Sequence, residues 1–222
     1  MKFNTTCEEP VSVFTLIKQN AFDKVEEMIL NNELNVNEVD GVGNDVVTRL
    51  LKAKQYDLVI EVMKKRNWDV NHQNDEGNTF GHVLACDDSA MAVKVMECLT
   101  KKKNYIPNIK NHRGETAMDI AISNHFLCTA FKLLEDKRFN DISVFSFKDL
   151  FKLCFDTKLY GKYTKITNLE IIVDNLEKKD LNTGMQNLVD HIQDNMDAIK
   201  RDFMNDKTVI LETIINTHLE TE

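Results

Sequence analysis

The sequence predicts an all-α fold, a solenoid of about four to five stacked helix-turn-helix repeats capped by C-terminal helices. Three observations lead to this prediction. Seven glycines and two prolines among 222 residues are few for a β-sandwich or barrel, which needs many tight turns. A short polar segment occurs three times, and the glycines that end its copies lie 34 and 37 residues apart. Apolar residues spaced i, i+3, i+4 follow the copies, as they do on one face of a helix.

Each copy of the polar segment runs from an Asn to a Gly with five residues between them. The three copies are 37–43, 71–77 and 108–114. Two residues after the Gly comes Thr79 or Thr116, and Asp45 stands at that place in the first copy. A side-chain oxygen there can cap a helix that starts next, while the Gly supplies the positive φ of a hairpin tip.

The segments after the copies predict the second helix of each repeat. An opening repeat in 11–30 suits two short helices joined near Asn20. The middle repeat is about three residues longer, and its trio is either Val95, Cys98 and Leu99 or the shifted pair Val93 and Met96. The trios in the other repeats are Val25, Met28 and Ile29; Val59, Val62 and Met63; and Ala130, Leu133 and Leu134.

Residues 77–82 read G-N-T-F-G-H and resemble the G-x-T-P-L-H motif of the ankyrin repeat family, while 114–121 read G-E-T-A-M-D-I-A and resemble its G-x-T-A-L-D-x-A variant. The resemblance covers roughly residues 11–156. It departs from the family at Gly81, which stands in place of Leu, and at Trp68, which replaces a small residue. The first copy lacks both the Thr and the P-L-H triplet.

Beyond the repeats, 145–155 suits a buried helix, 158–167 a polar connection, and a helix starting at Thr167 or Asn168 should follow. Residues 180–184 should form a break. A heptad-like seam then runs Met185, Val189, Ile192, Met196, Ile199 and Phe203, and Asp206 can cap a final helix. We therefore divide the chain into an ankyrin repeat domain, 1–157, and an acidic helical extension, 165–222, which carries 12 acidic and 6 basic side chains. The extension either caps the solenoid or pairs with a partner chain.

The sequence holds no pattern typical of an enzyme or a cofactor site. No glycine-rich phosphate loop, G-x-S-x-G or H-E-x-x-H occurs. Cys86 and His82 lie one helical turn apart, yet the resemblance implies that His82 links neighbouring turns. His72 and His112 lack a third metal ligand. We expect no enzyme activity, no cofactor and no metal.

The net charge and the cysteine content limit the classes of partner and the cellular compartment that we expect. The formal charge of −8 makes direct nucleic-acid binding unexpected. The basic runs 64–66 and 101–103 should complement the ends of their own helices. Five cysteines, an odd count without C-x-x-C, are expected to be mostly small buried residues. With no secretory signal in 1–20 and no 18-residue apolar stretch, we expect a protein of the cytoplasm or nucleus without a membrane span.

The resemblance implies an adaptor or interaction module that recognises another protein through a concave face of hairpin tips and first helices. Trp68 either fills a gap in the core or anchors the partner. The tips should contribute Asp40, Val42, Asn74, Asp75, Glu76, Asn111, His112 and Arg113. The ends of the first helices should add Lys52, Lys54, Asp87, Asp88, Asn124 and His125.

An alternative role uses the other end of the chain. A subunit of a larger assembly, or a pathogen effector, could make its main partner contact through the C-terminal helices, and 183–219 could also mediate homo- or hetero-oligomers. The short stack with a helical tail resembles small ankyrin proteins and transcription-factor ankyrin domains of fungi.

Overall fold

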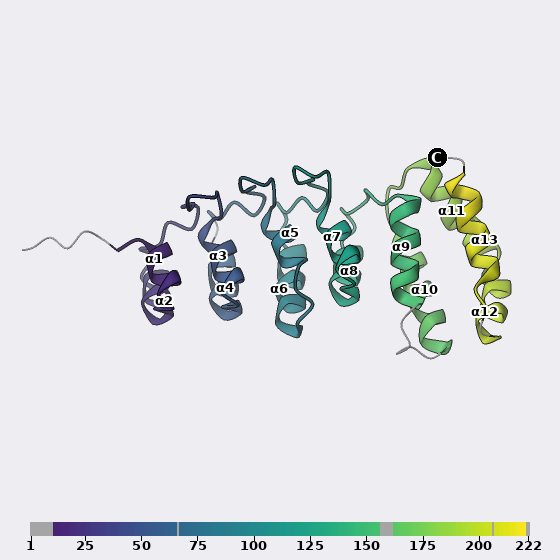
Figure 1. Cartoon of the computed structure of the whole chain (residues 1–222), viewed down its shortest axis with the longest axis horizontal. Helices are drawn as coiled ribbons and strands as arrows, with labels where there is room; N and C mark the ends of the chain where they lie inside the picture. Colours follow the sequence, from purple (N-terminus) through teal and green to yellow (C-terminus); the bar gives the residue numbers. More distant parts are fainter. Residues whose placement is uncertain (1–10, 66, 156–161, 206, 221–222) are drawn as a thin grey trace, which may run out of the picture.

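The computed structural model describes residues 11–65, 67–155, 162–205 and 207–220. These residues form thirteen helices and no β-strand, which confirms the predicted all-α fold. The helices succeed one another along an elongated molecule, and loops project between neighbouring pairs (Figure 1). Their bounds are α1 Val13–Lys18, α2 Phe22–Leu30, α3 Val46–Lys52, α4 Tyr56–Met63, α5 Phe80–Leu84, α6 Ala90–Thr100, α7 Ala117–Ser123, α8 Leu127–Leu134, α9 Val144–Phe155, α10 Lys162–Leu176, α11 Thr183–Asp194, α12 Met196–Met204 and α13 Val209–Leu219.

The first ten helices form five pairs that stack in sequence order. Within each pair the first helix packs on the second. Between pairs, α1, α3, α5, α7 and α9 pack in one row, and α2, α4, α6, α8 and α10 pack in another. One continuous apolar core, from Val13 to Ile215, runs through both rows and into the C-terminal helices. The stack therefore has the predicted number of repeats, with α9 and α10 as a fifth, longer pair.

Three hairpin tips project between the pairs, and each turns at a glycine with positive φ, as predicted. The φ angles are 73° at Gly43, 75° at Gly77 and 78° at Gly114. A Cβ at Gly77 would lie 2.7 Å from the backbone nitrogen of His112, whereas one at Gly114 would meet nothing within 4 Å. Each of the first two tips is thus covered by the next, and the third has an open outer side.

The first helix of each of three repeats begins at the predicted capping residue. Asp45 accepts a hydrogen bond from the Thr48 backbone N–H at 2.7 Å, and Thr116 accepts one from that of Asp119 at 3.3 Å. At Thr79 the cap is reciprocal, because the Nδ1 of His82 accepts the Thr79 backbone N–H at 3.1 Å. These bonds satisfy N–H groups that a helix start leaves without partners.

The basic runs do cap helix ends, but not only those of their own helices. Lys64 and Lys101 pair with Glu61 and Glu97 of their own helices. The next cation in each run, Lys65 or Lys102, reaches back to the previous repeat, where carbonyl oxygens at the end of the second helix carry partial negative charge. Arg138 and Lys179 do the same further along the chain. Lys65 thus bonds Ile29, Lys102 bonds Met63, Arg138 bonds Lys102 and Thr100, and Lys179 bonds Asp136, all at backbone oxygens. The expectation that these cations act within one helix was wrong, since the stack brings the end of one second helix beside the next.

Asparagines that open the polar segments form a second ladder between repeats. The side-chain amides of Asn37, Asn71 and Asn108 donate to the backbone oxygens of Asn67, Asn104 and Arg138, at 2.6, 2.7 and 3.1 Å. Each asparagine oxygen also accepts a backbone N–H from that following repeat. The ladder fixes the spacing of successive repeats along the edge from which the hairpins depart.

The extra residues of the middle repeat lengthen its second helix. α6 has 11 residues, whereas α4 and α8 have 8 each. Val95 and Leu99 are fully buried, and Cys98 is partly buried and packs against the core. Val93 is also partly buried but is not among the side chains that pack on the core. Of the two predicted faces, the structure therefore selects Val95, Cys98 and Leu99, to which Met96 adds a further buried side chain.

The C-terminal helices differ from the prediction in their bounds. The helix expected at 145–155 is α9, but α10 begins at Lys162 rather than at Thr167 or Asn168, because Ile166 already packs on the core one turn earlier. The predicted break is shifted as well, since Asn182 caps α11 through the Met185 backbone N–H. Residues 158–161 of the predicted connection lie outside the described residues, as does Asp206.

The heptad-like seam is divided between two helices. α11 ends and α12 begins at Asn195, whose side-chain amide donates to the His191 backbone oxygen at 2.9 Å. Such a bond competes with the helical ladder, so two helices rather than one carry the predicted apolar seam. The start of α13 is held by Asp202, whose carboxylate accepts the Ile210 backbone N–H at 3.0 Å.

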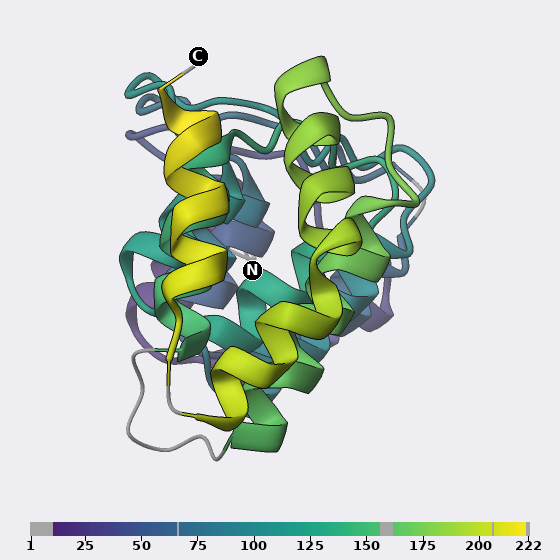
Figure 2. The ribbon, with the colours of Figure 1, turned by 90° about the vertical axis from the view of Figure 1, so that its right-hand side faces the viewer.

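The last three helices cover the end of the stack. α11 and α13 pack on α9, and α12 packs on α10; seen from the C-terminal end, the three lie across the repeats (Figure 2). The seam residues point inward, and Met185, Val189, Ile192 and Ile199 are fully buried. These contacts favour the cap over the partner helix, because the apolar face is already occupied by the chain itself.

Candidate functional site

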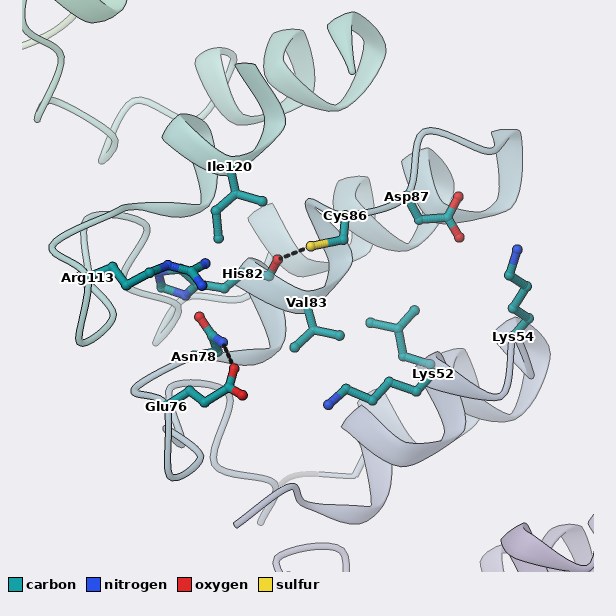
Figure 3. Close-up of a pocket in the computed structure, with 11 residues that line it drawn as sticks. Lys52, Lys54, Glu76, Asn78, His82, Val83, Cys86, Asp87, Arg113 and Ile120 are labelled. Carbon is teal, nitrogen blue, oxygen red and sulfur yellow. Dashed lines mark hydrogen bonds between the residues drawn. The ribbon is translucent and has the colours of Figure 1, made fainter. Parts of the chain in front are cut away.

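The candidate site is a groove of two adjoining hollows along the row of first helices, below the hairpin tips. One hollow, of about 390 Å³, is drawn in Figure 3 and lies between α3, α5, α7 and two tips. The other, of about 480 Å³, lies between α1, α3 and the first tip. Lys52 lines both hollows. The other lining residues are Leu51, Lys54, Glu76, Asn78, His82, Val83, Cys86, Asp87, Arg113 and Ile120 in the first, and Phe14, Ile17, Lys18, Asp40, Arg49 and Ala53 in the second.

The repeat register explains which side chains reach the groove. The first helices of the three repeats are capped by Asp45, Thr79 and Thr116. The fourth residue after each cap is Arg49, Val83 or Ile120, and the seventh residue after the first two caps is Lys52 or Cys86. Residues three or four apart lie on one helix face. The structure places this face toward the groove in successive first helices, so equivalent positions from three repeats form one surface.

Two cations face each other across the first hollow. Figure 3 shows the Lys52 amine and the Arg113 guanidinium on opposite sides of Val83. Lys52 donates one hydrogen bond, to the amide oxygen of Asn44 at 3.0 Å, and Arg113 pairs with Glu115 at 2.7 Å at the exposed rim. Desolvation of the sulfur raises the pKa of the nearby Cys86 thiol, the positive charges of Arg113 and Lys52 oppose that rise, and the carboxylate of Glu115 adds to it.

Two of the three carboxylates that line the groove, those of Asp40 and Asp87, are used by the fold. Asp40 pairs with Arg49 and accepts backbone N–H groups of Val42 and Asn44. Although burial opposes ionisation, these bonds lower the pKa of Asp40. Asp87 accepts a hydrogen bond from the Tyr56 hydroxyl. Both groups are thus ionised and satisfied within the chain.

The predicted tip residues divide into those that build the tips and those that are exposed on them. Asp40, Asn74 and Asn111 occupy the same position in the three tips, where one side-chain oxygen accepts two backbone N–H groups and closes the turn. Asn74 and Asn111 are buried. The exposed tip residues are Val42, Asp75, Glu76, His112 and Arg113.

The predicted residues at the ends of the first helices are also spread over different roles. Lys52 and Lys54 line the groove. Asp88 instead binds the next repeat, accepting the backbone N–H and hydroxyl of Thr129 at 2.9 Å each. Asn124 caps α7 and donates back to Ile120, and His125 takes a positive φ of 61° in the turn before α8.

Trp68 lies in the core. It is 4% exposed, packs edge-to-face on Phe80 with ring centroids 5.2 Å apart, and donates from Nε1 to the Asp45 carboxylate at 2.8 Å. The structure therefore supports the first of its two predicted roles, filling the core, and gives a partner no access to the indole.

The histidine and cysteines considered for chemistry have structural surroundings. Nε2 of His82 bonds the Glu115 backbone oxygen at 2.9 Å, which joins two repeats as the resemblance implied, and burial lowers its pKa. The Cys86 thiol donates to the backbone oxygen of His82 at 3.6 Å, not to the ring. Contrary to expectation, Cys86 and Cys128 are exposed; Cys7 and the side chain of Cys154 lie outside the described residues. Across the described part of the chain, no three His, Cys, Asp or Glu side chains are grouped to hold a metal.

Comparison with known proteins identifies the architecture. No protein-family model and no curated protein matches the chain. Among the described helices none is long and apolar enough to cross a membrane. The fold is similar to a crystal structure of an ankyrin repeat protein, with 17% sequence identity, a TM-score of 0.55, and coverage of 80% of this chain and 85% of the other. The chain thus has the fold of an ankyrin repeat protein.

Proposed function

We propose that the chain is a protein-interaction module that holds a segment of a partner protein in the groove and contacts it with the hairpin tips. The observation that carries the proposal is that groove-facing positions of three successive first helices form one surface. Repeats that contact only their neighbours leave one extended face to a partner. Lys52, Lys54 and Arg113 are exposed on this face, so they are free to contact a partner without disturbing the apolar core.

The exposed tips extend this surface. Asp75, Glu76 and Arg113 project beside the groove, while the residues behind them close the turns. Because the tips stack through their backbones, with the His112 N–H donating to the Glu76 oxygen at 3.1 Å, they are held in a fixed spacing. A preformed surface of this kind binds with little ordering cost.

Comparative affinity purification tests the proposal. Val83→Arg places a long charged side chain in the groove, and Val209→Arg makes the same change at an exposed position on α13. We expect partners retained by the unmodified chain and by Val209→Arg to be lost by Val83→Arg and by combined charge reversal of Asp75, Glu76 and Arg113. Thermal melting should be unchanged in the charge reversal, whereas Val83 also packs against the core, so Val83→Arg is assayed below its own melting transition. Partners retained by all variants would contradict a groove-based function. Partners that are lost only with Val209→Arg would instead support the C-terminal helices as the main contact.

A further inference from the structure

We propose that the partner segment taken by the groove is acidic, a peptide that places carboxylates beside Lys52 and Arg113 and an apolar side chain between them. This inference rests on the proposed function and adds the chemistry of its partner. It follows from three properties: cations outnumber anions in the groove, the chain as a whole is acidic, and apolar side chains lie between Lys52 and Arg113.

The groove carries more cations than anions. It is lined by the cations Lys18, Arg49, Lys52, Lys54 and Arg113 and by the carboxylates of Asp40, Glu76 and Asp87. Arg49 and two backbone N–H groups bind Asp40, Tyr56 and the Ser89 N–H bind Asp87, and the exposed Glu76 accepts a hydrogen bond from the Asn78 amide at 2.8 Å. Lys52 binds only a neutral amide, that of Asn44. The pair of Arg113 with Glu115 is exposed, and such pairs contribute little and exchange readily. A carboxylate entering the groove therefore meets cations that can turn to it.

These cations belong to a chain that is acidic overall. The chain carries a formal charge of −8, so a basic segment would be attracted to many parts of its surface. An acidic segment finds few places that favour it, and the groove is one. Charge complementarity of this kind contributes more to the choice of partner than to affinity.

The floor between the two cations is apolar. Val83 and Ile120 line the hollow from successive first helices, and Val83 lies between Lys52 and Arg113 (Figure 3). Burying one apolar side chain on this floor supplies the nonpolar part of binding. The segment that fits therefore alternates acidic and apolar residues rather than carrying an unbroken acidic run.

A second basic region provides the control. A shallow hollow at the C-terminal ends of α6 and α8, away from the groove, is bordered by Lys101, Lys102, Lys103, Lys132 and Lys137. There Lys102 bonds the end of α4, and Lys101 and Lys132 pair with Glu97 and Glu135. The residues that border this hollow are charged, apart from Thr100, so it offers an entering segment no apolar floor. We therefore expect the groove rather than this edge to take a segment that combines acidic and apolar residues.

Selection from a phage library of random dodecapeptides on the full chain tests the inference. We expect enriched peptides with net negative charge and at least one apolar residue between acidic ones. For the best synthetic peptide, measured by fluorescence anisotropy, combined Lys52→Glu and Arg113→Glu should weaken binding by at least about tenfold. Combined Lys101→Glu and Lys103→Glu, an equal change of charge, should change it by less than about twofold.

The remaining outcomes separate a failure of this inference from a failure of the proposed function. Neutral or basic peptides that are displaced by Val83→Arg would sustain the proposed function and overturn the acidic partner. Acidic peptides whose affinity falls with combined Lys101→Glu and Lys103→Glu, but not with combined Lys52→Glu and Arg113→Glu, would overturn the inference and place the acidic segment at the edge of α6 and α8. No enriched peptide, or peptides indifferent to Val83→Arg, would contradict both. Combined Lys52→Gln and Arg113→Gln, which only remove charge, should give a smaller loss in the same direction and repeat the test if the charge reversal unfolds the chain.

Discussion

The indole N–H of Trp68 donates to the carboxylate of Asp45 at 2.8 Å, and both groups are buried. This bond joins two of the positions at which the first full repeat departs from the ankyrin pattern. One oxygen of Asp45 caps α3 at the Thr48 N–H, as a threonine would, and the other accepts the indole, which a threonine hydroxyl could not also do in this geometry. The two departures are therefore one compensated change.

Asp45→Thr should destabilise the chain although it restores the family pattern. It leaves the indole N–H buried without an acceptor, at a cost of about 1–3 kcal/mol. In a double-mutant cycle with Trp68→Phe, measured by urea unfolding, the combined cost should be smaller than the sum by at least about 0.5 kcal/mol. Additive costs would show that the two residues act independently.

The stacked tips predict unequal costs for the same glycine substitution. Gly77→Ala and Gly114→Ala both force an alanine to a positive φ, which costs about 1–2 kcal/mol. Gly77→Ala also drives its Cβ against His112, which adds about 1–3 kcal/mol, whereas Gly114 has open space. Chemical denaturation should rank Gly77→Ala as clearly the worse; equal losses would argue against close stacking of the second and third tips.

Lys179 predicts a pH dependence. Its amine donates to the Asp136 backbone oxygen at 2.6 Å, and burial lowers its pKa to about 8 from 10.5. Between these values the unfolded chain holds a proton that the folded chain has released, so this group makes stability rise with pH, by up to about 1.4 kcal/mol per unit. Below pH 8 both states hold the proton and the contribution is flat.

Lys179→Met removes this titration. We expect the difference in unfolding free energy between the unmodified chain and Lys179→Met to be constant below about pH 8 and to shift in favour of the unmodified chain from there to pH 9.5. Comparing the two proteins cancels the titration of tyrosines and thiols. A difference independent of pH would mean that the buried amine keeps its ordinary pKa.

The cap predicts that the repeats depend on the last helices. Leu188→Ala opens a cavity in the buried face of α11 and should cost about 2–5 kcal/mol. Val209→Ala, at a side chain 61% exposed, should cost less than about 0.5 kcal/mol. Since Trp68 is the one tryptophan and lies in the repeats, its fluorescence during urea unfolding reports whether loss of the cap reaches them. An unshifted Trp68 transition in Leu188→Ala would identify the extension as an independent unit.

Local signals in the sequence were sufficient to predict the repeats. The Asn, Gly and Thr spacing predicts the tip and the start of the next helix because each acts on backbone groups within a few residues. The face toward the groove was available in the same register, at the fourth and seventh positions after each cap. The sequence-based choice included Lys52, the seventh position in the first repeat, but fell on Asp87 and Asp88 in the second repeat and on Asn124 and His125 in the third. Val83, Cys86 and Ile120 were missed because their apolar character resembles that of core residues.

Contacts between repeats could not be predicted in the same way. The bond from Trp68 to Asp45 and the capping of one helix by a cation of the next depend on the distance between stacked pairs, which no local pattern encodes. The division of the seam at Asn195 was missed because the apolar spacing continues through it, and only a side-chain amide bonded to the backbone interrupts the helix.

Amide hydrogen exchange of the full chain, with and without the best dodecapeptide selected on it, tests the central claim most directly. Binding in the groove predicts slower exchange in α3, α5 and α7 and in the tips at 72–78 and 109–115, with α4, α6 and α8 unchanged. Protection confined to α11–α13, or to the outer row of second helices, would contradict recognition through the first helices and their hairpins.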